Sequence, residues 1–503
     1  MGKTVNVIVE FAAAAVPQPP SMSFEVGDER TDVALEAHAP ADVPGLVLDR
    51  EYGAIPLAGL VPRVVEDHVF DVGEAEAVDA SPAKSTYLVR GTVDSSAITD
   101  QGVRIQAPNV VNVWADTRIE VCTICPGSPA LGTDADVAAL LDVPGLAKNH
   151  MDGNGVLVAI VDTGVNLAYL RSKGKTPGFD ASRSWVPRAG LVPGELPVGH
   201  GTMCAYDVLI AAPRCTLLDV AVLRSTQQGG SVMDGLLSDA VRAYAHLLRI
   251  LLTPKRPGEN RSMVVNNSWG MFHPSWDFPL GHPGRYSDNP AHPFNRIVGS
   301  LERAGADILF AAGNCGRECP DGRCRRVTNA GIFGANSHPQ VLCIAGVDVQ
   351  KNRVGYSTSG PGLLGRIKPD LSSYTHFAGS GVYGADGGTS AATPVAAGVL
   401  AAFRSRFPYN VHRPVTHPAA VRTLLTRTAE DRGAVGFDFD YGWGIINGRR
   451  LAKLRSLEAR EPIGRELAAG AEAPEVPVEA PPPAPMPVEE AEPVAPAEQR
   501  PAA

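Results

Sequence analysis

The chain has no run of eighteen or more apolar residues among its 503, and a membrane-spanning helix needs about that length. The first sixteen residues carry one lysine and an apolar run interrupted by Asn6 and Glu10, a poor match to a secretory signal peptide. Position 6 also lacks the serine or threonine of a myristoylation motif. These absences predict no membrane partner and a cytoplasmic location.

Basic helices and basic stripes interleaved with aromatic residues are missing as well, so nucleic-acid binding is not expected. The net charge of −9 is unevenly distributed, because residues 1–150 carry 22 acidic and 9 basic side chains, whereas residues 151–460 carry 34 basic and 23 acidic ones. Opposite charges favour docking of the acidic segment on the basic body. The sequence has no internal repeat, and nothing in it specifies an oligomeric state.

Three regions differ in composition. Residues 1–128 are acidic and turn-rich, and the stretches 85–93 and 110–119 are typical of strands, so we predict a small α+β or β-rich accessory or propeptide-like segment. Residues 461–503 contain 11 prolines and are expected to form a disordered tail that cannot bury a core. Residues 129–460 form the predicted main domain.

Short apolar runs recur through the main domain and alternate with stretches of helical periodicity, such as 231–252, for which Ser231 is the expected cap. The runs are 156–161, 217–223, 263–265, 307–311 and 341–347. Continuous apolar strands are typical of a parallel sheet buried on both faces, and the alternation predicts an α/β fold. Sites in such sheets form where strands end, and Asp162 and Asn314 each follow such a strand.

Three ionisable or nucleophilic side chains stand among small residues. Asp162 begins Asp-Thr-Gly, His200 lies in Gly-His-Gly-Thr at a helix start, and Ser390 lies in Gly-Gly-Thr-Ser before the helix expected at 391–407. A serine hydrolase needs an imidazole to accept the serine proton and a carboxylate to orient the ring. The amide of Asn314 and the backbone N–H of Ser390 can stabilise an oxyanion. Taken alone, Asp162 is more typical of a strand-end cap or a metal ligand, His200 of a helix cap, and Asn314 of a turn residue.

Together these motifs resemble the subtilisin-like serine peptidases over about residues 135–455. The segments 159–165, 199–202, 311–314 and 388–394 resemble the family's aspartate, histidine, oxyanion and serine motifs in its order, and 267–270 and 441–444 resemble further family segments. The resemblance implies a three-layer domain and endopeptidase activity on polypeptide substrates. The implied catalytic residues are Asp162, His200, Ser390 and Asn314, and the implied substrate-binding residues are Ser268, Trp269, Gly270, Ala312 and Gly313.

No cofactor is expected. Calcium sites are common in the family, but no complete ligand loop or other metal site is identified. Three cysteines, Cys315, Cys319 and Cys324, directly follow Asn314 and depart from the family pattern. A disulfide clip, a zinc site and reduced thiols are the alternatives; a cytoplasmic location disfavours the first, and the spacing fits no common zinc pattern.

The N-terminal segment stands where the family often carries a propeptide. It is either an inhibitory or folding unit that docks on its own catalytic domain and is cut between about residues 122 and 134, or a permanent accessory domain. Two other functions remain open for the whole chain: a catalytically idle peptide-binding module, and a serine esterase or transferase that uses the same residues.

Overall fold

The computed structural model describes most of the main domain and part of the N-terminal segment. The described residues are 4–12, 45–49, 51–57, 86–103, 105, 110–121, 129–224, 233–253, 260, 262–328 and 331–457. The expected tail, the boundary at residue 128 and the cap Ser231 lie outside these residues. None of the described helices is long and apolar enough to cross a bilayer.

Seven parallel strands form the central sheet of the main domain, in the order β10-β11-β9-β13-β15-β16-β17. The predicted apolar runs supply five of the seven strands. The bounds are β9 Leu157–Val161, β10 Gly178–Phe179, β11 Thr216–Val220, β13 Met263–Asn267, β15 Ala306–Ala311, β16 Leu342–Val347 and β17 Leu371–Tyr374.

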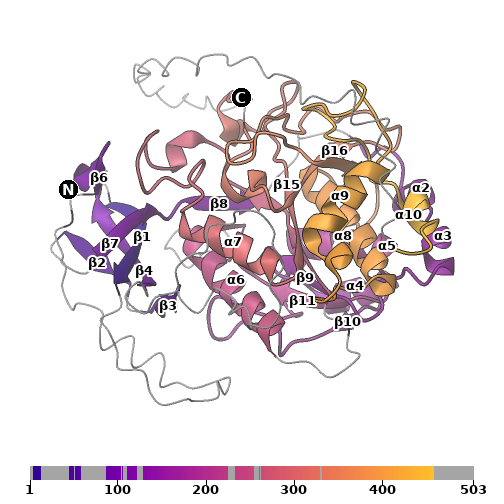
Figure 1. Ribbon diagram of the computed structural model, residues 1–503, viewed down its shortest axis with the longest axis horizontal. Helices are drawn as coiled ribbons and strands as arrows, with labels where there is room; N and C mark the ends of the chain where they lie inside the picture. Colours follow the sequence, from indigo (N-terminus) through magenta and orange to yellow (C-terminus); the bar gives the residue numbers. More distant parts are fainter. Residues whose placement is uncertain are drawn as a thin grey trace, which may run out of the picture. The chain divides into compact units, whose positions relative to one another are not determined.

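Both faces of this sheet are covered by helices, which explains why its strands are apolar throughout. In β9, Val158 and Ile160 pack in a core with α5 (His200–Ala211) and α8 (Thr389–Arg406). Its other residues pack in a second core with α6 (Leu237–Leu252) and α7 (Pro293–Arg303). Figure 1 shows these two helix pairs on opposite sides of β9 and β11. The predicted three-layer α/β fold is therefore confirmed.

The helix predicted from Ser231 begins later than expected, at Leu237, because Asp234–Leu236 form strand β12. The helix predicted to start at His200 is α5, which ends at Ala211. The other α-helices among the described residues are α2 Asp134–Leu140, α3 Val143–Lys148, α4 Leu167–Ser172, α9 Pro418–Thr428 and α10 Gly448–Ala452.

The described part of the N-terminal segment contains an antiparallel sheet in the order β2-β4-β1-β7, with β3 also paired to β4. Buried and exposed residues alternate only loosely along these strands. The strands enclose a small apolar core. The bounds are β1 Thr4–Ala12, β2 Leu46–Leu48, β3 Ile55–Pro56, β4 Thr86–Asp94 and β7 Val110–Ala115; the hairpin β5 Ile98–Thr99 and β6 Gly102–Val103 forms separately.

The strand predicted over 110–119 is interrupted at Asp116, and a new strand, β8, begins at Arg118 and ends at Val121. The buried carboxylate of Asp116 accepts hydrogen bonds from the backbone N–H (2.9 Å) and hydroxyl (2.8 Å) of Ser238. Ser238 lies in the first turn of α6, so Asp116 caps that helix from the N-terminal segment. This contact turns the chain out of the first sheet.

β8 lies between β12 and β14 (Trp269–Gly270) in a three-stranded antiparallel sheet. β14 follows β13 of the central sheet with only Ser268 between them. A strand of the N-terminal segment is therefore paired with the segment that was predicted to line the substrate cleft.

Candidate active site

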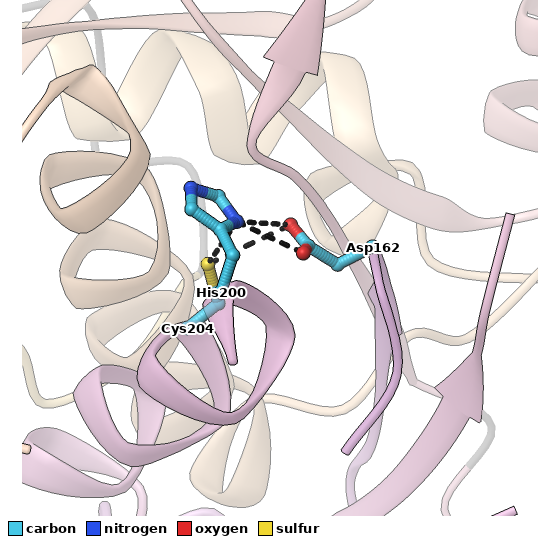
Figure 2. A group of neighbouring side chains, drawn as sticks. All are labelled: Asp162, His200 and Cys204. Atoms are coloured by element: carbon cyan, nitrogen blue, oxygen red, sulfur yellow. Dashed lines mark hydrogen bonds and ion pairs between the residues drawn. The ribbon is translucent and has the colours of Figure 1, made fainter. Parts of the chain in front are cut away.

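Asp162 and His200 are hydrogen-bonded at the carboxyl edge of the central sheet. Asp162 directly follows β9, and His200 is the first residue of α5. Nδ1 of His200 lies 2.9 and 3.0 Å from the two carboxylate oxygens of Asp162, as Figure 2 shows. Because the carboxylate accepts the Nδ1 proton, the neutral ring presents Nε2 as a base. Nε2 is buried and has no hydrogen-bond partner within the described part of the chain.

Small residues allow the aspartate and histidine segments to approach closely. A Cβ on Gly201 would lie only 2.5 Å from the carbonyl oxygen of Gly164, so a larger residue would separate the two segments. The backbone N–H of Gly201 also donates to the hydroxyl of Thr163, at 2.9 Å. The residues that flank Asp162 and His200 therefore fix the distance between them.

Ser390 lies in the first turn of α8, after Gly388, whose φ of 75° favours glycine. The Ser390 hydroxyl donates to the carbonyl oxygen of Ser268, and the Ser268 hydroxyl donates to the carbonyl oxygen of Ser390, each at 3.0 Å. These reciprocal bonds hold the start of α8 against the residue that precedes β14.

Cys204 contacts all three residues of the predicted triad. Its Sγ lies 3.7 Å from Oδ2 of Asp162, 3.8 Å from Nδ1 of His200 and 3.6 Å from the carbonyl oxygen of Ser390. The sequence predicts only that Cys204 packs on its helix. The available signal is its spacing, since a helix brings residues four apart onto one face. One sulfur atom thus limits how far apart the three segments lie.

Asn314 is buried beside the start of α8. Its Oδ1 accepts hydrogen bonds from the backbone N–H and the hydroxyl of Thr389, both at 3.0 Å. The Thr389 hydroxyl in turn accepts the backbone N–H of Gly313 at 3.1 Å. Because Thr389 directly precedes Ser390 and engages Oδ1, it fixes the orientation of the Asn314 carboxamide, whose Nδ2 is its hydrogen-bond donor.

The five predicted substrate-binding residues contribute in different ways. Trp269 offers only its backbone, because its side chain is fully buried and its indole N–H donates to the carbonyl oxygen of Val161 at 2.9 Å. Gly270 pairs with β8 and, together with Ala312 and Gly313, lines a small cavity. The carbonyl of the fifth, Ser268, accepts the Ser390 hydroxyl.

The cysteines after Asn314 form a disulfide clip, one of the three predicted alternatives. Cys315 is bonded to Cys324, and Cys319 is also disulfide-bonded. The backbone N–H of Asp321 donates to the carbonyl oxygen of Asn314 at 2.8 Å. Disulfides persist in oxidising compartments, so this clip weighs against the cytoplasmic location, which stays a prediction.

In the described part of the chain, one group of three metal-capable side chains is found, namely Asp162, His200 and Cys204. Calcium takes oxygen ligands, so a set with a thiol and an imidazole does not fit the calcium that the family resemblance suggests. Nδ1 of His200 is already bonded to the carboxylate. This group therefore acts chemically as a hydrogen-bonded pair with an adjacent thiol.

Asp207 of α5 and Asp386, which lies shortly before Ser390, are two buried carboxyls that influence each other electrostatically. Burial raises the pKa of Asp207 well above the usual range, and the nearby charge of Asp386 raises it further, while Lys175 opposes the shift. Burial also raises the pKa of Asp386, whose oxygens accept bonds from the backbone and hydroxyl of Ser380. A proton held by Asp207 relieves the repulsion between the two carboxyls.

We predict that Asp207 lowers the stability of the protein as the pH rises. In the unfolded chain its carboxyl ionises near pH 4, whereas the folded protein holds the proton to higher pH. Its stabilising contribution is therefore complete below about pH 4 and is lost as the pH rises through the folded-state pKa. The melting temperature of Asp207→Asn should fall less between about pH 5 and 9 than that of the unmutated protein, whereas the exposed control Asp100→Asn should follow the unmutated protein. Parallel curves for Asp207→Asn and the unmutated protein would contradict this.

Known proteins match the main domain. The model of the subtilase family, peptidase S8, matches residues 153–444. Subtilisin Savinase of Lederbergia lenta is 25% identical over 326 residues, which cover 61% of this chain and 94% of that protein. An alkaline protease of Alkalihalobacillus alcalophilus is 25% identical over 326 residues (61% and 67%), and subtilisin E of Bacillus subtilis is 25% identical over 324 residues (62% and 70%). The family match covers more than half of the chain and includes Asp162, His200 and Ser390, so the chain belongs to the subtilase family.

Proposed function

We propose that the protein is a serine endopeptidase that hydrolyses peptide bonds with Asp162, His200 and Ser390. The observation that carries this proposal is the contact of a single sulfur atom, Sγ of Cys204, with all three residues at 3.6 to 3.8 Å. Membership of the subtilase family supports serine peptidase activity. The bond between His200 and Asp162 supplies the oriented base that a serine nucleophile requires.

In the proposed reaction, the hydroxyl oxygen of Ser390 attacks the carbonyl carbon of the substrate while its proton passes to Nε2 of His200. Asp162 stabilises the resulting imidazolium. The hydroxyl is bonded to the carbonyl oxygen of Ser268 before substrate binds, so it must rotate toward His200; catalytic hydrogen bonds often form fully only with substrate present. His200 then protonates the leaving amine and activates the water that hydrolyses the acyl-enzyme.

We assign Nδ2 of Asn314 and the backbone N–H of Ser390 as donors to the developing oxyanion. The bonds from Thr389 to Oδ1 hold the carboxamide in one orientation, and the N-terminus of α8 adds a partial positive charge. Side chains and backbone of this chain thus supply the nucleophile, base and oxyanion donors, so the proposed reaction calls for no cofactor.

We further propose that the N-terminal segment occupies the place of a substrate. An extended substrate binds by adding a strand to exposed strand edges, and β8 pairs in this way with both β12 and β14. Two more contacts support docking: the cap of α6 by Asp116 and the hydrogen bond from the Tyr52 hydroxyl to the carbonyl oxygen of Ser238, at 2.8 Å. The segment in this position excludes other peptides.

Two other functions would give different results in activity assays. An idle peptide-binding module would need neither the oriented imidazole nor the fixed carboxamide beside Ser390, and it would bind peptides without cleaving them. A serine esterase or transferase would turn over esters or acyl acceptors but not peptides. Comparing hydrolysis of a peptide and of the matching ester by the purified protein separates both from a peptidase.

Ser390→Ala should abolish peptide hydrolysis, because the mechanism has no other nucleophile. By analogy with subtilisin, kcat should fall by about 10⁶-fold, measured with a fluorogenic peptide. The exposed control Ser172→Ala, whose hydroxyl donates only within its own helix at 2.7 Å, should keep full activity. Equal activity of Ser390→Ala and the unmutated protein would refute the assignment.

The intact masses of the unmutated protein and of Ser390→Ala test whether the protein cleaves its own N-terminal segment. Loss of the N-terminal segment from the unmutated protein alone indicates a self-cleaved propeptide, whereas identical masses that include Met1 indicate a permanent accessory domain.

Asn314→Ala should lower kcat by about 10²–10³-fold with little change in KM, because it removes a donor that acts mainly in the transition state. Steady-state kinetics on a peptide substrate measures both constants. A change confined to KM would show that Asn314 binds the ground state instead of stabilising the oxyanion.

A further inference from the structure

The strand in the cleft, β8, carries two charged side chains that meet charged partners on the main domain. Arg118 contacts Asp234 of β12 at 2.8 Å, and Glu120 contacts Arg323 at 2.6 Å. The other two side chains of the strand, Ile119 and Val121, are almost fully buried in the apolar core. The strand therefore presents an apolar face to the core and a charged face to the cleft rim, as alternation along a strand requires.

The pairing of β8 fixes the direction of any chain that binds there. Val121 lies opposite Trp269, and Glu120 lies opposite Gly270, in an antiparallel arrangement. A bound chain continued in this register brings its next residue opposite Ser268, whose carbonyl accepts the Ser390 hydroxyl. Glu120 thus marks the position two residues before the residue of the bound chain that lies opposite Ser268, next to Ser390.

The guanidinium of Arg323 is oriented by residues of the main domain as well as by Glu120. Its Nε and one terminal nitrogen donate to the two carboxylate oxygens of Asp321, at 2.9 and 2.8 Å. Its other terminal nitrogen donates to Glu120 at 2.6 Å, and the group lies over the ring of Phe272 at 3.8 Å. The neighbouring disulfide of Cys324 restrains the same loop. A fixed guanidinium loses little conformational freedom when it binds a carboxylate.

We propose that Arg323 determines substrate specificity by selecting an acidic side chain two residues before the substrate residue that lies opposite Ser268. This inference rests on the proposed peptidase function and adds the substrate class: peptides with glutamate or aspartate at that position, preceded and followed by apolar residues. Glu120 is the internal example. Glu120 is only 8% exposed, so an uncharged replacement loses a charge-assisted hydrogen bond in a site largely shielded from water.

The test uses the full chain and fluorogenic peptides built on the sequence Arg-Ile-Glu-Val that differ only at the glutamate, which is kept or replaced by glutamine or lysine. The glutamate peptide should have a kcat/KM about tenfold or more above that of the glutamine peptide, the effect of one hydrogen bond to a charged group. Because β8 competes with every peptide alike, the ratio does not depend on how often it leaves the cleft.

Substitutions of the arginine should change this ratio in a defined direction. Arg323→Gln should bring the ratio close to one, and Arg323→Glu should make the lysine peptide the best substrate. The matched control is Arg317→Gln, on the same loop, because Arg317 bonds to Asp440 at 3.1 Å and is 50% exposed; it should keep the preference for glutamate. Cleavage of all three peptides at equal rates by the unmutated protein would overturn the inference and leave the peptidase function intact.

A second measurement does not depend on catalysis. In the Ser390→Ala background, hydrogen exchange of the backbone amides of Arg118–Val121 reports how firmly β8 is held in the cleft. Adding Arg323→Gln should speed exchange about tenfold, whereas adding Arg317→Gln should not. Faster exchange in this background, together with no cleavage of any peptide by the protein that keeps Ser390, would refute the peptidase function but keep the recognition by Arg323. Unchanged exchange would overturn the recognition.

Discussion

The buried hydrogen bond between Asp162 and His200 is the interaction on which the rest of the site depends. It fixes the proton on Nδ1 and leaves Nε2 as the base, and a serine without an oriented base is a weak nucleophile. The fold provides this bond by ending β9 at Val161 and beginning α5 at His200, with Gly201 small enough for close approach. Parallel strands bring such ends to one edge of the sheet, so the sheet and the site are consequences of the same arrangement.

The start of α8 is held against this pair by contacts from several segments. Ser268 exchanges two hydrogen bonds with Ser390, Thr389 binds Asn314, and Cys204 contacts the carbonyl of Ser390. Asn314 also begins the loop closed by the disulfide of Cys315. Asn314, the proposed oxyanion donor, and Arg323, which contacts Glu120 of β8, therefore lie on or beside one loop restrained by a disulfide. In the proposed mechanism, this loop connects the stabilisation of the oxyanion with the recognition of the substrate.

Much of the fold could be predicted from the sequence because parallel strands buried on both faces leave continuous apolar runs, and because the motifs around Asp162, His200 and Ser390 are local. The remainder depends on contacts between distant segments. The start of α6 was misplaced because residues 234–236 pair with β8, more than a hundred residues earlier. The ion pair of Glu120 with Arg323 likewise joins distant segments. The disulfide of Cys315 with Cys324 is local, but cysteine spacing alone leaves the connectivity open. The helical spacing of Cys204 from His200 predicts only that it packs on the helix, whereas its sulfur contacts all three segments of the site.

We propose Ser390 as the nucleophile and His200 as the base that activates it. The most direct measurement is to react the purified protein with a fluorophosphonate, which phosphonylates activated serines, and to locate the adduct by peptide mass spectrometry. The account predicts a single adduct on Ser390 that is lost in His200→Ala, while the protein remains folded by circular dichroism. An adduct on another serine, or undiminished labelling of Ser390 in folded His200→Ala, would contradict it.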